Sequence, residues 1–366
     1  MIVQEGPGAR LAKLRRRLEE EGIGCLLVTD ILNVQYLSGF TGSAGQVVVT
    51  PERTLFLADS RYHLRAEQET SGCEVVRVEG PKKPFQAVAE ALLGLGLTEV
   101  YFEPTLSYGT YAELASELPG VALKQGKDLV GELRMVKDAG EIERLRAAAA
   151  LTDACFDFVL GLLRPGITEW EVAAEIECFF RRNGSARESF ETIVASGPLA
   201  ASPHASATEK PIAAGDLVLM DFGAIYRGYA ADITRTVAVG HADDRQREAY
   251  AAVLEAQEAA IQAIRPGVRG RDVDQVARDV ITARGFGEVC YAHGLGHSLG
   301  KHVHDGPALS RTSEVVLAPG MVITVEPGIY DPEWGGIRIE DDVLVTETGC
   351  ELLTHSPKEF TVVAAG

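Results

Sequence analysis

Two apolar segments of the sequence end in a carboxylate, and a second acid lies on the segment that returns from each. Asp221 ends the run Leu-Val-Leu-Met, and Asp232 follows a turn near residues 226–228. Glu326 and Glu340 repeat this arrangement about 105 residues further along. Buried acids have to be paired, hydrogen-bonded or bound to a metal ion. The sequence therefore predicts four carboxylates that share an interior site.

The register of the first hairpin follows from the position of its turn. If the turn centres between Tyr226 and Arg227, Asp221 lies directly opposite Asp232 on one face. Glu326 and Glu340 are expected to pair in the same way across a looser turn, whose register is left open.

Histidines concentrate between the two hairpins, where His293, His297, His302 and His304 fall within 12 positions. An oxygen-rich site with one imidazole suits two divalent ions such as Mn²⁺, with Co²⁺, Fe²⁺ or Zn²⁺ as alternatives. Four carboxylates balance the charge of two such ions. A hydroxide that bridges the ions would be activated for hydrolysis. The other interpretation is a network of acids salt-bridged to arginine, with Arg235 and Arg338 nearby.

An internal repeat supplies the elements that would position these residues. Arg164-Pro165-Gly166 recurs as Arg265-Pro266-Gly267, and each copy lies between two helical segments. Residues 215–221 resemble residues 320–326, and both are apolar strands that begin with glycine and end in an acid. Thr168 and Glu171 have the spacing of a capping box. Two related halves that face each other would bring the matched acids to a shared centre.

The first 131 residues alternate between helical and strand-like segments, which predicts an α/β domain. Lys127–Leu133 marks the seam, so the predicted domains are 1–131 and 132–366, with an α+β class overall. The expected helices cover residues 11–21, 61–69, 85–93 and 108–118, and the expected strands cover residues 24–29, 46–50, 54–58, 74–78 and 100–103.

Composition and charge exclude several classes of protein. With 46% hydrophobic and 24% charged residues, the chain is neither disordered nor fibrous. Its formal net charge of -18 argues against binding to nucleic acid or to an anionic membrane. The six cysteines form no CxxC pair, and no apolar run approaches 18 residues. We expect a cytoplasmic protein with reduced thiols and no signal peptide.

At this point the sequence resembles the pita-bread metallopeptidase family, which includes aminopeptidase P, prolidase, methionine aminopeptidase and the metal-free creatinase. The segments that carry the resemblance are MDFGAIYRGYAADITRTVAVG, HGLGHSLG, ITVEPGIY and GIRIEDDVLVTETGCELLT. YLSGFTGS at residues 36–43 resembles the N-terminal domain of aminopeptidase P, prolidase and creatinase. The resemblance implies a creatinase-like first domain followed by a pseudo-twofold pita-bread catalytic domain.

Five residues fall on the metal-ligand positions of that family. Asp232 and Glu340 would bridge both ions. Asp221 would hold one ion, while His297 and Glu326 would hold the other. Because all five ligands are present, the resemblance implies catalysis.

Further roles are implied by the same resemblance. Glu326 also falls on the position of a proton-shuttling acid, and His204 on a substrate-binding or proton-handling position. His304 falls where the scissile carbonyl oxygen is stabilised. His293 would line a proline pocket, and Arg338 would orient Glu340 or the substrate.

The resemblance implies an Xaa-Pro aminopeptidase, whose substrates are peptides with proline at position 2. The X-Pro bond is a tertiary amide without an amide hydrogen, so general peptidases handle it poorly. One alternative is a prolidase restricted to Xaa-Pro dipeptides, and another is a non-catalytic peptide-binding module on the same fold. A homodimer is expected, in which the first domain of a partner closes the site.

One segment departs from the family pattern. The family commonly has Gly-Leu before its x-Val-His, whereas here Gly300 is followed by Lys301 and His302. Strand alternation would place His302 and His304 on one face and Lys301 on the other. A minor role for Lys301 is therefore expected.

Overall fold

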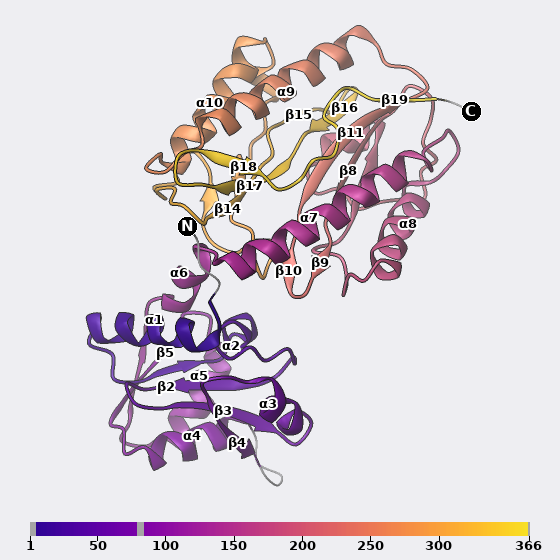
Figure 1. The fold of residues 1–366 in the computed structure, drawn as a ribbon. Coiled ribbons are helices and arrows are strands. Elements are labelled where there is room, and N and C mark those ends of the chain that lie inside the picture. Colours follow the sequence, from indigo (N-terminus) through magenta and orange to yellow (C-terminus); the bar gives the residue numbers. More distant parts are fainter. Residues whose placement is uncertain (1–4, 79–83, 365–366) are drawn as a thin grey trace. The chain divides into compact units, whose positions relative to one another are not determined.

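The computed structural model describes residues 5–78 and 84–364, which form two compact units divided between Arg134 and Met135 (Figure 1). The division lies three residues beyond the boundary expected at residue 131. Helix α6 (Leu129–Met135) occupies the expected seam, so that part of the chain is helical.

The first unit is built around one six-stranded sheet. Its strand order is β4-β3-β2-β1-β5-β6, with antiparallel pairs within β1-β2-β3 and parallel pairs elsewhere. The expected hairpin between β2 and β3 is confirmed, whereas β6 was not expected. The strands are β1 Leu26–Val28, β2 Gln46–Val49, β3 Thr54–Asp59, β4 Glu74–Val78, β5 Glu99–Phe102 and β6 Ala122–Gln125. The helices before α6 are α1 Pro7–Glu20, α2 Ile31–Ser38, α3 His63–Glu69, α4 Pro84–Gly94 and α5 Tyr108–Glu117.

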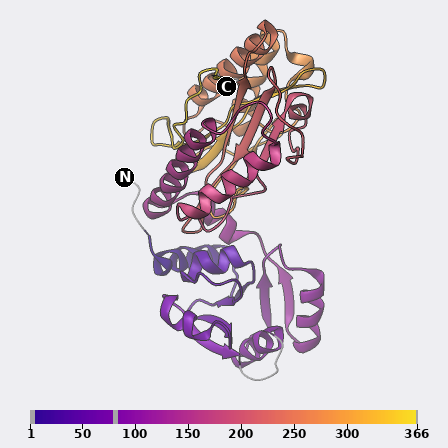
Figure 2. The ribbon, with the colours of Figure 1, turned by 90° about the vertical axis from the view of Figure 1, so that its right-hand side faces the viewer.

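Two pairs of helices in the second unit confirm the internal repeat. Helices α7 (Ala139–Leu160) and α8 (Glu169–Arg182) form one pair, and α9 (Asp244–Ala263) and α10 (Gly270–Ala283) form the other. Figures 1 and 2 show each pair side by side. The capping box of Thr168 and Glu171 begins α8 as expected, because each residue bonds the backbone N–H of the other.

The strands of the second unit divide between its two halves. The first half contains a sheet of order β19-β11-β8-β7, and the second half one of order β14-β17-β18. Apolar residues of α7 and α8 share a core with β8 and β11, and those of α9 and α10 share one with β14 and β17. The strands are β7 Ile193–Ser196, β8 Leu217–Phe222, β9 Ile225–Tyr226, β10 Tyr229–Ala230, β11 Ile233–Val239, β12 Gly296–His297, β13 Ala308–Leu309, β14 Val322–Val325, β15 Gly328–Asp331, β16 Gly335–Arg338, β17 Asp341–Val345, β18 Cys350–Leu352 and β19 Val362–Val363.

The register expected for the first hairpin is wrong by two positions. Asp221 pairs with Thr234, so it does not lie directly opposite Asp232. The turn centres on Arg227 and Gly228, whose φ angles of 47° and 79° are both positive, as in a type I′ turn. Such a turn favours glycine at its second central position, and Gly228 meets that demand. Because the shift is an even number of residues, the two acids still share one face.

The second hairpin keeps its two acids opposite each other. Val325 pairs with Asp341 on one side of them, and Gly328 pairs with Arg338 on the other. The same register places Glu326 across from Glu340. The four acids thus occupy equivalent ends of two hairpins.

No helix of the described residues is long and apolar enough to span a membrane. All six cysteines are free thiols in the structure.

Candidate active site

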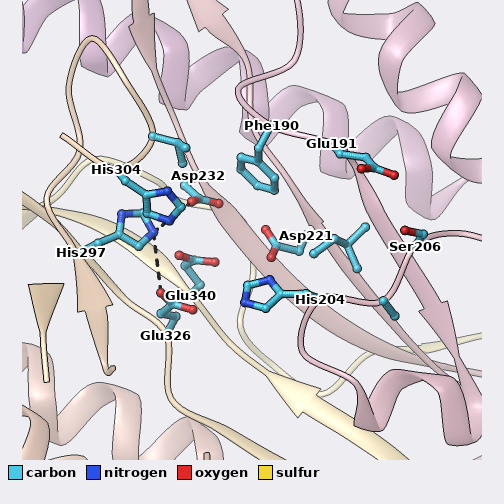
Figure 3. Close-up of a pocket in the computed structure, with 13 residues that line it drawn as sticks. Phe190, Glu191, His204, Ser206, Asp221, Asp232, His297, His304, Glu326 and Glu340 are labelled. Carbon is cyan, nitrogen blue, oxygen red and sulfur yellow. Dashed lines mark ion pairs between the residues drawn. The ribbon is translucent and has the colours of Figure 1, made fainter. Parts of the chain in front are cut away.

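The acids of both hairpins line one pocket of about 250 Å³ in the second unit (Figure 3). It contains all five expected metal ligands together with His204 and His304. Two expected substrate-binding residues, His293 and Arg338, are not among its lining. The lining residues are Phe190, Glu191, Ile193, His204, Ala205, Ser206, Asp221, Asp232, His297, Val303, His304, Glu326 and Glu340.

Three expected ligands lie close enough to share one ion. Asp232, His297 and Glu340 each present a ligand atom, and these atoms lie within 4.8 Å of one another. His297 Nε2 lies 3.6 Å from Asp232 Oδ2 and 3.7 Å from Glu326 Oε1. Asp232 from the first half and Glu326 from the second half therefore converge on the imidazole nitrogen of His297, which lies in β12.

Several carboxylate oxygens in this pocket lack the partners that buried acids require. Asp221 Oδ1, Asp232 Oδ1 and Glu340 Oε1 are buried and have no hydrogen-bond partner in the described part of the chain. Leaving such oxygens unpaired in the interior is costly. Oxygen ligands of this kind suit hard or borderline divalent ions, so the donor set fits the metal centre that the sequence implies.

The pKa values of the site follow from burial and crowding of like charges. Burial and the neighbouring Asp221 raise the pKa of Glu340 to about 8. Burial and the charge of Glu340 also raise the pKa values of Asp232 and Glu326 well above their usual range. Burial lowers the pKa of His297 to about 4, so its imidazole is neutral near pH 7. Metal binding at this site must therefore displace protons from carboxyl groups.

Arg338 contacts one candidate ligand directly and another through a threonine. Its Nη2 donates to Asp221 Oδ2 at 2.5 Å, and its Nε donates to Thr234 Oγ1 at 2.9 Å. Thr234 Oγ1 in turn donates to Glu340 Oε2 at 2.6 Å. The alternative interpretation, in which the acids are salt-bridged to arginine, thus holds for Asp221 Oδ2. Asp221 Oδ1 has no hydrogen-bond partner among the described residues.

Tyr330 joins the same network to His293. Its hydroxyl oxygen accepts from Arg338 Nη1 at 2.8 Å and lies 3.0 Å from His293 Nε2. Burial lowers the pKa of His293 to about 4. Tyr330 and Arg338 therefore connect His293 to Asp221.

The histidine segment differs from its expected conformation. Residues 301–304 form bends and no strand, so the expected alternation of faces is wrong. The backbone folds back on itself because His302 Nδ1 accepts from the backbone N–H of His304 at 3.1 Å. His304 packs edge-on against His297, with ring centroids 4.4 Å apart. The ammonium of Lys301 lies 5.2 Å from the centre of the Tyr229 ring, outside the pocket lining.

A buried arginine fixes the backbone beside Glu340. Arg235 is 1% exposed and donates to the carbonyl oxygen of Glu340 and to Asp341 Oδ1. It also donates to the carbonyl oxygens of Ser356 and Pro357, at 2.8 and 3.1 Å. Arg235 thereby joins the first-half strand β11 to the second hairpin and to a later segment of the chain.

Sequence reasoning missed the residues that support the ligands. Thr234 was detectable, because it lies two positions after Asp232 and so faces the same side. Nothing in the sequence indicated that Tyr330 or Phe190 lies at the site, since aromatic residues at such positions ordinarily pack in the hydrophobic core.

Comparisons with known proteins identify the family of both units. Metallopeptidase family M24 matches residues 143–347, and the creatinase/prolidase N-terminal domain matches residues 10–136. The solved Xaa-Pro dipeptidase from Bacillus anthracis has a TM-score of 0.94 and 41% identity, covering 98% of this chain and 100% of its own. The X-Pro aminopeptidase from Thermotoga maritima gives a TM-score of 0.88 and 38% identity, over 95% and 100%. The Xaa-Pro dipeptidase of Pyrococcus furiosus is 37% identical over 353 residues, 96% of this chain and 99% of its own.

The chain therefore belongs to metallopeptidase family M24. It is a metal-dependent hydrolase of peptide bonds, with a creatinase-type N-terminal domain and an M24 catalytic domain. The expected fold class is confirmed, and the family implies divalent metal ions.

Proposed function

We propose that the chain is a dinuclear-metal exopeptidase that hydrolyses the bond between an N-terminal residue and a following proline. The observation that carries the proposal is the set of unpartnered buried oxygens on Asp221, Asp232 and Glu340 beside His297. The relatives named for Xaa-Pro bonds support the substrate class. Mn²⁺ is the first choice of metal, and Co²⁺, Zn²⁺ and Fe²⁺ are the alternatives.

In this proposal each expected ligand has a defined place. Asp232 and Glu340 would hold both ions, Asp221 would hold one ion, and His297 and Glu326 would hold the other. The convergence of Asp232 and Glu326 on His297 Nε2 supports this assignment. Arg338 compensates part of the charge of Asp221 and positions its carboxylate.

Bound divalent ions would polarise the scissile carbonyl and lower the pKa of a water molecule. Glu326 lines the pocket with its carboxylate 3.7 Å from His297 Nε2, and in this proposal it passes a proton to the departing proline nitrogen. Burial lowers the pKa of His304, and its neutral ring can donate a hydrogen bond to the carbonyl oxygen. His204 lies beside Asp221 in the pocket and binds substrate or moves a proton there (Figure 3).

The second candidate function is that of a prolidase restricted to Xaa-Pro dipeptides, which the names of two relatives favour. Hydrolysis of Ala-Pro, Ala-Pro-Pro and Met-Ala-Ala with added Mn²⁺ separates the candidates. We expect release of alanine from both proline peptides. Cleavage of Ala-Pro alone would favour prolidase, and cleavage of Met-Ala-Ala alone would contradict proline specificity.

A peptide-binding module without activity is the candidate of another class. Stoichiometric metal together with hydrolysis excludes it, whereas a metal-loaded protein that hydrolyses no peptide would support it. Replacing Asp232 with Ala should abolish both metal binding and turnover. Near-normal turnover would show that the ligand assignment is wrong.

We further propose a cytoplasmic homodimer that binds neither nucleic acid nor membranes. The net charge of -18 supports the last two points. Light scattering would test the dimer, and cell fractionation would test the location.

A further inference from the structure

We infer that Glu191 gives the pocket a preference for a basic first residue in the substrate, lysine or arginine. The inference rests on the proposed function, because it names the side chain that precedes the proline.

Glu191 occupies the end of the pocket that lies away from the candidate metal ligands. Figure 3 shows Glu191 and Ser206 on one side and His297 and Glu326 on the other, with Phe190 between them. Glu191 is exposed, so a substrate can reach its carboxylate.

The wall that leads to Glu191 suits the stem of a long side chain. Phe190 directly precedes Glu191 and Ile193 lies two residues after it, and both line the pocket together with Ala205. Lysine and arginine place their methylene groups along apolar surface and hold the charge in water. A proline ring is compact and uncharged, so the first residue is the one that can extend to Glu191.

Charge counting leaves Glu191 as the acid that no ion neutralises. The pocket lining holds five carboxylates and neither lysine nor arginine. Two divalent ions would balance the four carboxylates that surround them. Asp221 also has Arg338, whereas Glu191 has no ion-pair partner within residues 5–78 and 84–364. The pocket therefore presents one free negative charge beside its apolar wall.

Two neighbouring acids keep this end of the pocket negative. Burial raises the pKa of Glu177, and the charges of Glu188 and Glu191 raise it further. Neither Glu177 nor Glu188 lines the pocket, and neither has an ion pair in the described part of the chain. Glu177 is thus a matched control, because its charge lies nearby without touching substrate.

The test compares kcat/KM for Lys-Pro with Met-Pro, and for Lys-Pro-Ala with Met-Pro-Ala, in the Mn²⁺-loaded protein. Methionine matches the stem of lysine without its charge. Since an exposed ion pair contributes a factor of about two to five, Glu191→Gln should lower the Lys/Met ratio by that factor. Glu177→Gln should leave the ratio within about the measurement error. High salt should reduce the wild-type ratio and leave that of Glu191→Gln unchanged.

Charge reversal provides a second variant. Glu191→Lys should turn the preference towards Glu-Pro, by roughly the square of the effect of neutralisation. Two results would overturn the inference while the proposed function stands: an unchanged ratio in Glu191→Gln, or an equal loss for both substrates. Failure to hydrolyse any of the four peptides would instead overturn the proposed function.

Discussion

Replacing Glu340 with Gln should change how the stability of the metal-free catalytic unit depends on pH. Burial, together with the charge of Asp221, raises the pKa of Glu340 from 4.5 to about 8. A carboxyl whose pKa is raised by folding binds its proton more tightly in the folded state. Its stabilising contribution is therefore complete below the unfolded pKa and is lost as the pH rises through the folded pKa.

The histidines of the site act in the opposite sense at lower pH. Burial lowers the pKa values of His293 and His297 from 6.5 to about 4, so their contributions grow up to pH 6.5 and then stay constant. The interval from pH 6.5 to 8 thus isolates the carboxyl groups. Across it, linkage gives a loss of about 1.6 kcal/mol in the free energy of unfolding from Glu340 alone. The wild type should lose at least that much more than Glu340→Gln, because the charge of Glu340 also raises the pKa values of Asp232 and Glu326.

Urea unfolding of the EDTA-treated proteins, followed by tryptophan fluorescence, measures this difference. Both tryptophans, Trp170 and Trp334, lie in the catalytic unit, so the signal reports that unit. Glu103, whose pKa burial raises to about 7, lies in the other unit and is not sampled. Saturating Mn²⁺ should reverse the trend, because the ions bind ionised carboxylates. Equal pH dependence in the two proteins would refute the reasoning.

Three further substitutions test the support of the site. Thr234→Val removes the hydroxyl between Arg338 and Glu340, so metal affinity by chelator competition should fall about tenfold, and unchanged affinity would contradict the network. Gly223→Ala would place a Cβ 1.7 Å from the carbonyl oxygen of Ala231, so the free energy of unfolding should fall by about 3 kcal/mol, and normal stability would show that the hairpin is pliable. His304→Ala should lower kcat by about 100-fold at full metal content, since it stabilises a carbonyl oxygen, and parallel loss of metal would place His304 on an ion instead.

The sequence predicted the four acids because each ends or begins a strand with an apolar pattern. Although the expected turn position was wrong, the prediction that Asp221 and Asp232 share a face was not affected. Side chains of a strand alternate with a period of two residues, and the register shifted by two positions. Turn geometry was the weaker signal. The positive φ of Arg227 is unusual for a residue with a side chain, and nothing in its type predicted it.

Long-range contacts among polar side chains could not be predicted. Arg338 was expected beside Glu340 or the substrate, yet its guanidinium bonds Asp221 from the other half of the unit. Residues 301–304 read as a strand, because local alternation cannot reveal that His302 accepts a bond from its own loop. Both outcomes depend on tertiary packing, which residue spacing does not encode.

The contacts of Arg235 have a consequence for the order in which the site forms during synthesis. Its guanidinium donates to the backbone carbonyl oxygen of Glu340 and also to those of Ser356 and Pro357. Lys358 forms an ion pair with Asp341, the residue after Glu340. The first half of the unit can leave the ribosome more than a hundred residues before these acceptors do. The ligand arrangement therefore becomes complete only after residue 358 has emerged. Until then the four acids lack the contacts of residues 356–358 with Arg235 and Asp341, and nascent chains arrested before that point should not retain the metal.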